Sequence, residues 1–398
     1  MLDFTYNVPT KVAFGHDAEA RVGELLAEQG ATKVLVHFGG GSVVRSGLLD
    51  RVLGYLDEAG IGHVELGGVQ PNPRISKVYE GIELAQKEGV DFLLAVGGGS
   101  VIDSTKAIAY GLAEPEHDVW ELYEHVRTAK ACFPLGSVLT ISAAGSETSN
   151  SSVITNDETL EKRAYDDDLA RPRIAIMNPE LTMTLPDYQT ACGCTDIMMH
   201  TMERYFTSVA PTMELTDGIA EALLRVVRDC ALILREEPDN YEARADVMWA
   251  GSLAHNGLTG CGTDGGDWSA HMLEHEVGGM FDVAHGAGLA AIWPHWARYV
   301  MADCMDRFVK FAVNVWDVDP EGKTDEEIAL EGVAAVEEFY HSIGMPTNFA
   351  ELGIEPTDEQ LEKLAHDCAI ACGGTQGSAK VLGEPEMLDV YKMAAGRA

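Results

Sequence analysis

Two apolar runs that each end in Gly-Gly-Gly-Ser constrain the first half of the chain most strongly. Residues 33–38 (KVLVHF) lead into Gly39–Ser42, and residues 91–96 (DFLLAV) lead into Gly97–Ser100. Amphipathic patterns typical of helices cover residues 47–60 and 75–89, and a further short strand pattern lies at 63–66. This alternation predicts a Rossmann-like α/β domain, with a parallel sheet and helices on both faces.

The glycine loops are candidates for binding a dinucleotide. Glycine allows a bound group to approach the backbone, and the start of a helix offers free N–H groups to a diphosphate. Neither loop has the GxGxxG pattern, and strand-to-helix turns also use glycine for steric reasons alone. A third segment, residues 139–155, has small and hydroxylated residues that suit a cofactor pocket, although its composition alone favours a polar surface loop.

The pattern changes near residue 185. Beyond this point the sequence is almost entirely helical in its periodicity, with long stretches rich in Ala, Leu, Met and Glu. A chain of 398 residues is also long for one hydrophobic core. We therefore expect two domains, an α/β domain at 1–185 and an all-α domain at 186–398.

Charge and cysteine usage restrict the partners and the compartment. The chain has 64 acidic and 28 basic residues, giving a formal net charge of −36, which argues against nucleic-acid and membrane partners. No apolar run is long enough to cross a bilayer. The first residues lack a basic-then-apolar signal pattern, so we expect a cytoplasmic protein whose eight cysteines are free thiols.

Histidines gather in one part of the second half. Asp196 and His200 are four residues apart and share a helix face, and the segment HMLEHEVGGMFDVAH contains His271, His275 and His285. One carboxylate and three imidazoles (Asp196, His200, His271 and His285) suit a divalent ion such as Fe(II) or Zn(II). Spacing alone leaves packed or solvated histidines as an equally good interpretation. Cys192 and Cys194 precede Asp196, but free cysteines are often small buried apolar residues.

Longer motifs along nearly the whole chain resemble one family. These motifs are YNVPTKVAFG, GGGSVVRSG, GGVQPNPRIS, FLLAVGGGSVIDSTKAIA, LTISAAGSE, MNPELTMTLP, TDIMMHTMERYFT and HMLEHEVGGMFDVAHGAGLAAIWP. In order and spacing they resemble the iron-containing (group III) alcohol dehydrogenases, in the branch of butanol dehydrogenases and broad-range aldehyde reductases. The resemblance implies an N-terminal dinucleotide domain and a helical metal domain with the dehydroquinate synthase-like fold, with the active site between them.

The resemblance also implies site residues. It assigns the metal to Asp196, His200, His271 and His285, and it places His275 beside the nicotinamide. The implied cofactor-binding residues are Gly39, Gly40, Gly41, Ser42, Gly97, Gly98, Gly99, Ser100, Val101, Thr140, Lys162 and Leu181. We interpret His275 either as a proton relay or as a residue that packs against the cofactor or supports the metal ligands. We also expect a homodimer.

The first glycine loop bears on cofactor choice. An acidic residue at this place would accept hydrogen bonds from the ribose and repel a 2′-phosphate. Here the segment is Gly39–Ser42 with Arg45 just beyond, so we expect NADP(H) to be preferred over NAD(H).

The predicted reaction is reversible hydride transfer between NADP(H) and short-chain primary alcohols or aldehydes, with the metal as a Lewis acid. Three alternatives remain at this stage: a glycerol dehydrogenase-like polyol oxidoreductase, a non-redox lyase of the dehydroquinate synthase type, and a metal- or NADP-binding protein without turnover. The lyase would need several basic residues for a phosphorylated acid, and residues 185–300 are poor in them.

Overall fold

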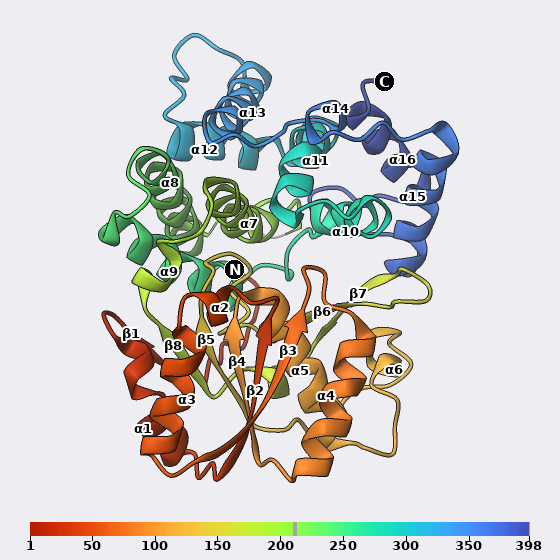
Figure 1. Ribbon diagram of the computed structural model, residues 1–398. Helices are drawn as coiled ribbons and strands as arrows, with labels where there is room; N and C mark the ends of the chain where they lie inside the picture. Colours follow the sequence, from red (N-terminus) through yellow and green to blue (C-terminus); the bar gives the residue numbers. More distant parts are fainter. Residues whose placement is uncertain (210–212, 398) are drawn as a thin grey trace. The chain divides into compact units, whose positions relative to one another are not determined.

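The chain divides into an α/β unit and a helical unit. The computed structural model describes residues 1–209 and 213–397. The α/β unit comprises Asn7–Thr184, whereas Leu185–Ala398 and the N-terminal Met1–Tyr6 make up the helical unit. The expected fold class, a parallel-sheet domain followed by a helical domain, is confirmed (Figure 1).

A six-stranded sheet organises the α/β unit. Its spatial order is β1-β8-β5-β4-β2-β3, and every neighbouring pair is parallel. The strands are β1 (Lys11–Phe14), β2 (Lys33–Gly39), β3 (Gly62–Val69), β4 (Phe92–Gly97), β5 (Leu135–Leu139) and β8 (Ile174–Met177). From β2 the chain moves outward to β3 and then returns to the other side of β2 to form β4. The order therefore reverses between β2 and β4, and such reversal points are where open α/β sheets bind ligands.

Helices cover both faces of this sheet because its strands are apolar on both sides. In β2, Val34 and Val36 join one buried cluster and Leu35 joins another, as the alternation of side chains along a strand requires. The first cluster includes residues of α1 (Val22–Glu28) and α3 (Leu48–Glu58), and the second includes residues of α4 (Ile75–Glu88) and α5 (Gly99–Ala113). Two short helices, α2 (Ser42–Arg45) and α6 (Trp120–Tyr123), follow β2 and α5 along the chain.

The segment at 139–155 is not the surface loop that its composition favours. Ser146, Glu147, Thr148 and Ser149 are all buried, ahead of the hairpin of β6 (Ser151–Thr155) and β7 (Lys162–Asp166). The fully buried Lys106 of α5 donates hydrogen bonds to Ser146 Oγ at 2.9 Å, Ser149 O at 3.0 Å and Ser151 O at 2.6 Å. The polar loop is buried because a lysine from a distant helix satisfies its oxygen atoms.

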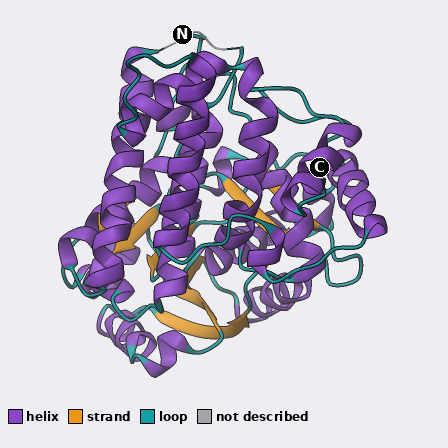
Figure 2. Cartoon of the chain, turned by 90° about the horizontal axis from the view of Figure 1, so that it is seen from above, coloured by secondary structure: helices purple, strands orange, loops and turns teal. Residues whose placement is uncertain are grey.

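Helices and their connecting loops make up the second unit, and none of its described residues belongs to either sheet. Figure 2 shows the helices and strands of the chain in separate colours. The helices of the second unit pack around one large core that contains Phe206, Trp293, Trp296 and Phe308. No helix in the described part of the chain has the length and apolarity needed to cross a membrane. The helices are α7 (Asp187–Tyr205), α8 (Glu214–Glu236), α9 (Tyr241–His255), α10 (Ser269–Phe281), α11 (His285–Val300), α12 (Met305–Trp316), α13 (Asp325–Ser342), α14 (Phe349–Leu352), α15 (Asp358–Ala371) and α16 (Glu384–Ala394).

Candidate functional site

Three helices of the helical unit bring the four predicted metal ligands together. Asp196 and His200 lie one turn apart on α7, His271 lies in the first turn of α10, and His285 is the first residue of α11. Gly286 permits a close approach of α11 to α7, since a Cβ atom there would lie 2.2 Å from the backbone oxygen of Cys192. The glycine that follows His285 therefore helps to place His285 beside the Asp196 helix.

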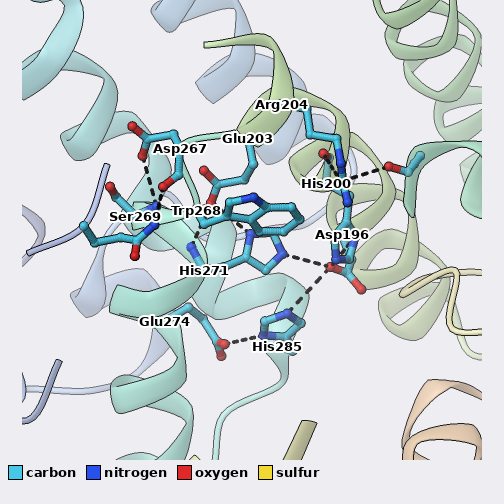
Figure 3. A network of polar contacts seen from close by, with 12 residues as sticks. Asp196, His200, Glu203, Arg204, Asp267, Trp268, Ser269, His271, Glu274 and His285 are labelled. Atoms are coloured by element: carbon cyan, nitrogen blue, oxygen red, sulfur yellow. Dashed lines mark hydrogen bonds and ion pairs between the residues drawn. The ribbon is translucent and has the colours of Figure 1, made fainter. Parts of the chain in front are cut away.

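The three imidazoles converge on a single carboxylate oxygen (Figure 3). Oδ1 of Asp196 lies 3.3 Å from Nδ1 of His200, 3.7 Å from Nε2 of His271 and 3.6 Å from Nε2 of His285. Four ligands placed about 2.0–2.1 Å from a tetrahedral ion lie about 3.4 Å from one another. Ligand atoms of Asp196, His200 and His271 lie within 4.8 Å of one another, and His285 reaches this group through Asp196 Oδ1. The three distances from Asp196 Oδ1 thus suit ligands of a single first-row divalent ion.

Burying the polar atoms of this cluster would cost free energy if no hydrogen-bonding group or cation were bound to them. The side chains of Asp196, His200 and His271 are only 5–6% exposed, and His285 is 28% exposed. Asp196 Oδ1, His200 Nδ1 and His271 Nε2 are buried and make no hydrogen bond with any described residue. Buried polar atoms normally have hydrogen-bond partners or coordinate metals. These three atoms face one another, so the residues present fit a bound cation.

Two further carboxylates hold the outer nitrogens of the histidines. Glu203 Oε1 accepts a hydrogen bond from Nδ1 of His271 at 2.9 Å, and Glu274 Oε2 accepts one from Nδ1 of His285. An ionised carboxylate only accepts hydrogen bonds, so both Nδ1 atoms carry a proton, and in the neutral imidazole the lone pair is then on Nε2. Both Nε2 atoms lie on the side of Asp196, where the lone pairs of neutral rings would face a bound cation.

The pKa values reflect the same arrangement. Burial alone would raise the pKa of Asp196, but the neighbouring imidazoles hold it well below its usual range. Burial lowers the pKa of His200 well below its ordinary value. It acts in the same direction on His271, but Asp196 and Glu203 outweigh it and raise the pKa of His271 to about 9. The buried carboxylates therefore attract positive charge to this place.

Aromatic and cationic groups surround the cluster. The ring of His255, at the end of α9, stacks on that of His200 with centroids 4.0 Å apart. The Trp268 ring centroid lies 5.3 Å from that of His271 and 6.0 Å from that of His200. The guanidinium of Arg204 lies over Trp268 at 4.5 Å, and its Nη1 donates to the backbone oxygen of His200 at 2.8 Å. This packing limits the orientations that the His200 ring can adopt.

His275 lies next to the four predicted ligands. It follows His271 by one turn on α10, and its ring centroid is 5.8 Å from that of His285. Potential ligand atoms of Glu274, His275 and His285 also lie within 4.8 Å of one another. The geometry thus places His275 beside His285, which is the most exposed of the four predicted ligands.

Most predicted cofactor residues lie at one edge of the sheet. Gly39 and Gly97 end β2 and β4, Thr140 directly follows β5, and Leu181 lies in the turn after β8. These four strands are adjacent and parallel, so their carboxyl ends share an edge. Lys162 lies apart on the hairpin, where it pairs with Thr155, whose N–H donates to Pro73 O after β3. Gly40 and Gly41 follow β2, Ser42 begins α2, and Gly98, Gly99, Ser100 and Val101 form the start of α5.

The two glycine loops differ in the space around them. A Cβ atom on Gly98 would lie 3.1 Å from the Ile141 side chain, and one on Gly99 would lie 3.0 Å from Cβ of Ala144. No atom of the described residues lies within 4 Å of a Cβ atom on Gly40. No side chain caps the N-terminus of α5, and a helix start of this kind offers backbone N–H groups to an anion. The N–H of Val101 already donates to Gly98 O at 3.0 Å. The second loop therefore combines a steric need for glycine with the features of a diphosphate site.

Sequence reasoning missed Glu203, Glu274, Trp268 and the position of His255. A signal for the two carboxylates was present in the spacing. Glu203 continues the Asp196/His200 face by three more residues, and Glu274 follows His271 by three. No comparable signal marks Trp268 or His255, since their contacts come from segments that are distant in sequence.

Sequence profiles of known families cover most of the chain. "Iron-containing alcohol dehydrogenase" matches residues 9–179, and "Fe-containing alcohol dehydrogenase family, C-terminal" matches residues 190–395. The chain belongs to the iron-containing alcohol dehydrogenase family. It is 41% identical to NADH-dependent butanol dehydrogenase A of Clostridium acetobutylicum, over 98% of this chain and 99% of that protein. It is 36% identical to the NADPH-dependent aldehyde reductase YqhD of Escherichia coli, over 89% and 90% of the two chains.

Solved structures agree with this membership. The structure of NADH-dependent butanol dehydrogenase A from Thermotoga maritima superposes with a TM-score of 0.95 at 36% identity and covers 99% of each chain. This iron-containing alcohol dehydrogenase is thus an oxidoreductase of the alcohol dehydrogenase and aldehyde reductase class. The family implies a divalent metal and a nicotinamide cofactor, while relatives of both NADH and NADPH dependence leave the choice between the two open.

Proposed function

We propose that Asp196, His200, His271 and His285 hold the divalent ion, Fe(II) or Zn(II), of this enzyme. The observation that carries the proposal is the convergence of three imidazole nitrogens on Asp196 Oδ1 at 3.3–3.7 Å. Burial supports it as well, since Asp196 Oδ1, His200 Nδ1 and His271 Nε2 make no hydrogen bond within the described part of the chain. One carboxylate and three neutral imidazoles leave one positive charge on a bound dication, which suits a Lewis acid.

The chemistry is hydride transfer between the nicotinamide and a short-chain aldehyde or primary alcohol. A bound ion supplies electrostatic stabilisation to the substrate oxygen, and the nicotinamide supplies the hydride. We infer that substrate approaches from the side of His285, because His285 is the most exposed of the four proposed ligands. His275 lies on that side, and we assign it the transfer of a proton between substrate oxygen and solvent.

Butanal and butanol are our proposed substrate types, on the strength of relatives that are named butanol dehydrogenases. The decisive experiment combines elemental analysis of anaerobically purified protein with NADPH and NADH oxidation against a panel of short aldehydes. We expect one Fe or Zn per chain and aldehyde-dependent oxidation. Protein that carries metal but oxidises neither cofactor with any aldehyde would contradict the proposed reaction and leave the metal site standing.

NADP(H) is our proposed cofactor, held at the sheet edge by Gly39–Ser42, Gly97–Val101, Thr140 and Leu181, and by Lys162 on the β6–β7 hairpin. Support comes from the absence of an acidic side chain in the first loop and from Arg45, whose Nη1 lies 3.3 Å from the Cβ position of Gly41. A positive charge at this loop favours a 2′-phosphate. A wild type that binds NADH at least tenfold more tightly than NADPH, about 1.4 kcal/mol, would contradict this preference.

Gly40→Asp tests the same loop. The space around Gly40 accepts a side chain, so the change adds a carboxylate without disturbing packing. We expect the Kd for NADPH to rise at least about tenfold more than the Kd for NADH, because the new charge repels the 2′-phosphate. Gly40→Asn is the matched uncharged control. An equal loss of affinity for both cofactors would show that this loop does not lie at the ribose.

We also propose a homodimer in a reducing compartment. All eight cysteines are free thiols, which suits the cytoplasm. Light scattering coupled to gel filtration measures the mass directly, and a mass of one chain would contradict the dimer.

A further inference from the structure

Glu203 and Glu274 form a pair of buried carboxylates that each contact one of the proposed metal-binding histidines. Their side chains are 1% and 0% exposed. Burying an ionised carboxylate is costly unless charge and hydrogen bonds compensate for it. In each case the Nδ1 atom of a histidine forms an ion pair with the glutamate.

The two contacts have the same geometry relative to Asp196. In His271 and in His285, Nδ1 faces the glutamate and Nε2 faces Asp196 Oδ1. Each imidazole thus connects an outer carboxylate to the centre of the cluster. A histidine that donates through one ring nitrogen to a carboxylate is a stronger ligand through the other nitrogen, and its ring orientation is set. His200 differs, since its ring is held by stacking on His255.

Each glutamate has further contacts that hold its carboxylate in place. Glu203 Oε1 also accepts a hydrogen bond from the backbone N–H of His271 at 2.9 Å, so it links α7 to the first turn of α10. Glu274 packs against Gly288 on α11, where a Cβ atom would lie 2.8 Å from Glu274 Cγ. Any larger residue at position 288 would displace the Glu274 side chain.

We propose that Glu203 and Glu274 are positioning residues that set the tautomer of His271 and His285 and increase the affinity of the site for a divalent cation. The inference rests on the proposed metal site. It goes beyond that proposal because it assigns part of the cation affinity to two side chains that do not touch the ion. Their negative charges, passed on through the imidazoles, add to the charge that Asp196 supplies.

Zn(II) affinity of the full-length protein tests this proposal. Wild type, Glu203→Gln and Glu274→Gln are stripped of metal, and their Zn(II) Kd is measured in competition with a chromophoric chelator. Glutamine keeps the size of each side chain and removes its charge. We expect Zn(II) to bind about 10–100-fold more weakly to each variant. Glu384→Gln is the matched control, because Glu384 contacts His366 at 3.2 Å on the exposed surface, and we expect no change there.

Two further measurements separate positioning from general damage. Gly288→Ala keeps the charge of Glu274 but moves its side chain, and it should weaken Zn(II) binding in the same direction. The visible spectrum of the Co(II)-loaded protein should shift in both glutamine variants, while the circular dichroism of the metal-free proteins stays that of wild type. Glu203 and Glu274 lie on different helices. If one variant fails to fold, the Zn(II) affinity of the other variant still tests the proposal.

The outcomes distinguish the two proposals. If wild type binds one Zn(II) and both glutamine variants bind it within twofold of the wild-type Kd, the positioning role is wrong and the metal site stands. If wild type binds no Zn(II), both the metal site and the positioning role are wrong.

Discussion

Both units contain buried polar groups, but the groups compared below differ in whether the protein supplies their hydrogen-bond partners. In the α/β unit, His37 has Leu66 O 2.8 Å from Nδ1 and Ser104 Oγ 2.9 Å from Nε2, so one neutral tautomer satisfies the whole contact. In the helical unit, Asp196 Oδ1, His200 Nδ1 and His271 Nε2 are equally buried yet make no hydrogen bond among the described residues. A polar cluster that is complete by itself serves the scaffold, whereas one that lacks partners is suited to bind a ligand.

The same contrast separates the two cofactor-related sites. The sheet edge uses backbone and glycine, so its affinity for a ligand depends on space and on free N–H groups. The histidine cluster uses side-chain charge, so its affinity depends on protonation and on single substitutions. The predictions that follow test this difference, beginning with the largest expected effect.

Asp196→Asn should abolish the site in the helical unit. The change neutralises the atom on which three imidazoles converge. We expect the loss of metal affinity to exceed the roughly 100-fold that removal of an outer hydrogen-bond partner costs, and activity to fall with it. Elemental analysis and aldehyde-dependent NADPH oxidation measure both. Full metal content with full activity would remove Asp196 from the ligand set.

His275→Ala should separate catalysis from metal binding. Since His275 lies outside the four ligands, we expect the metal content to remain at that of wild type. A lost proton transfer should lower kcat by about 10²-fold or more, with a smaller effect on the KM for NADPH. If the loss appears in the KM for NADPH and kcat is unchanged, then His275 packs against the cofactor and does not transfer a proton.

Because both ring nitrogens of the buried His37 have hydrogen-bond partners, we expect the protein to lose stability in acid. Burial lowers the pKa of His37 from 6.5 to about 4. Between pH 6.5 and about 4, His37 binds a proton in the unfolded chain but stays neutral in the folded protein. The free energy of unfolding therefore falls as the pH falls. At a pH below both pKa values, this difference lowers the free energy of unfolding by about 3 kcal/mol.

His37→Gln serves as the comparison for that pH dependence. Denaturant unfolding from pH 7 to pH 4 should give a flatter loss of stability in the variant than in wild type. Carboxylates elsewhere contribute equally to both proteins, so the difference in slope reports His37 alone. Identical slopes would mean that His37 is not held neutral in the folded protein.

Gly98→Ala and Gly40→Ala form a matched pair at the sheet edge. The new methyl group at position 98 meets Ile141 at 3.1 Å, so we expect a destabilisation of about 1–3 kcal/mol. The methyl group at position 40 meets no described atom within 4 Å and should change stability by less than about 0.5 kcal/mol. Chemical denaturation measures both, and equal effects would contradict the difference in packing between the loops.

The sequence by itself determined where these strands and helices form and which of their residues share a face. The apolar runs at 33–38 and 91–96 form β2 and β4, and the amphipathic patterns at 47–60 and 75–89 form α3 and α4. These features depend on contacts between residues a few positions apart, which periodicity records directly. The spacing of Asp196 and His200 likewise placed both on one face of α7 before any packing was known.

Only the tertiary structure decided which faces meet. It brought His271 and His285 onto Asp196, gave each an outer carboxylate in Glu203 and Glu274, and stacked His255 on His200. It also buried residues 146–149, because Lys106 supplies the donors that a polar loop needs. The physical reason is the same in each case. The cost of burying a charge or a hydroxyl depends on partners from distant segments, and local sequence does not specify them.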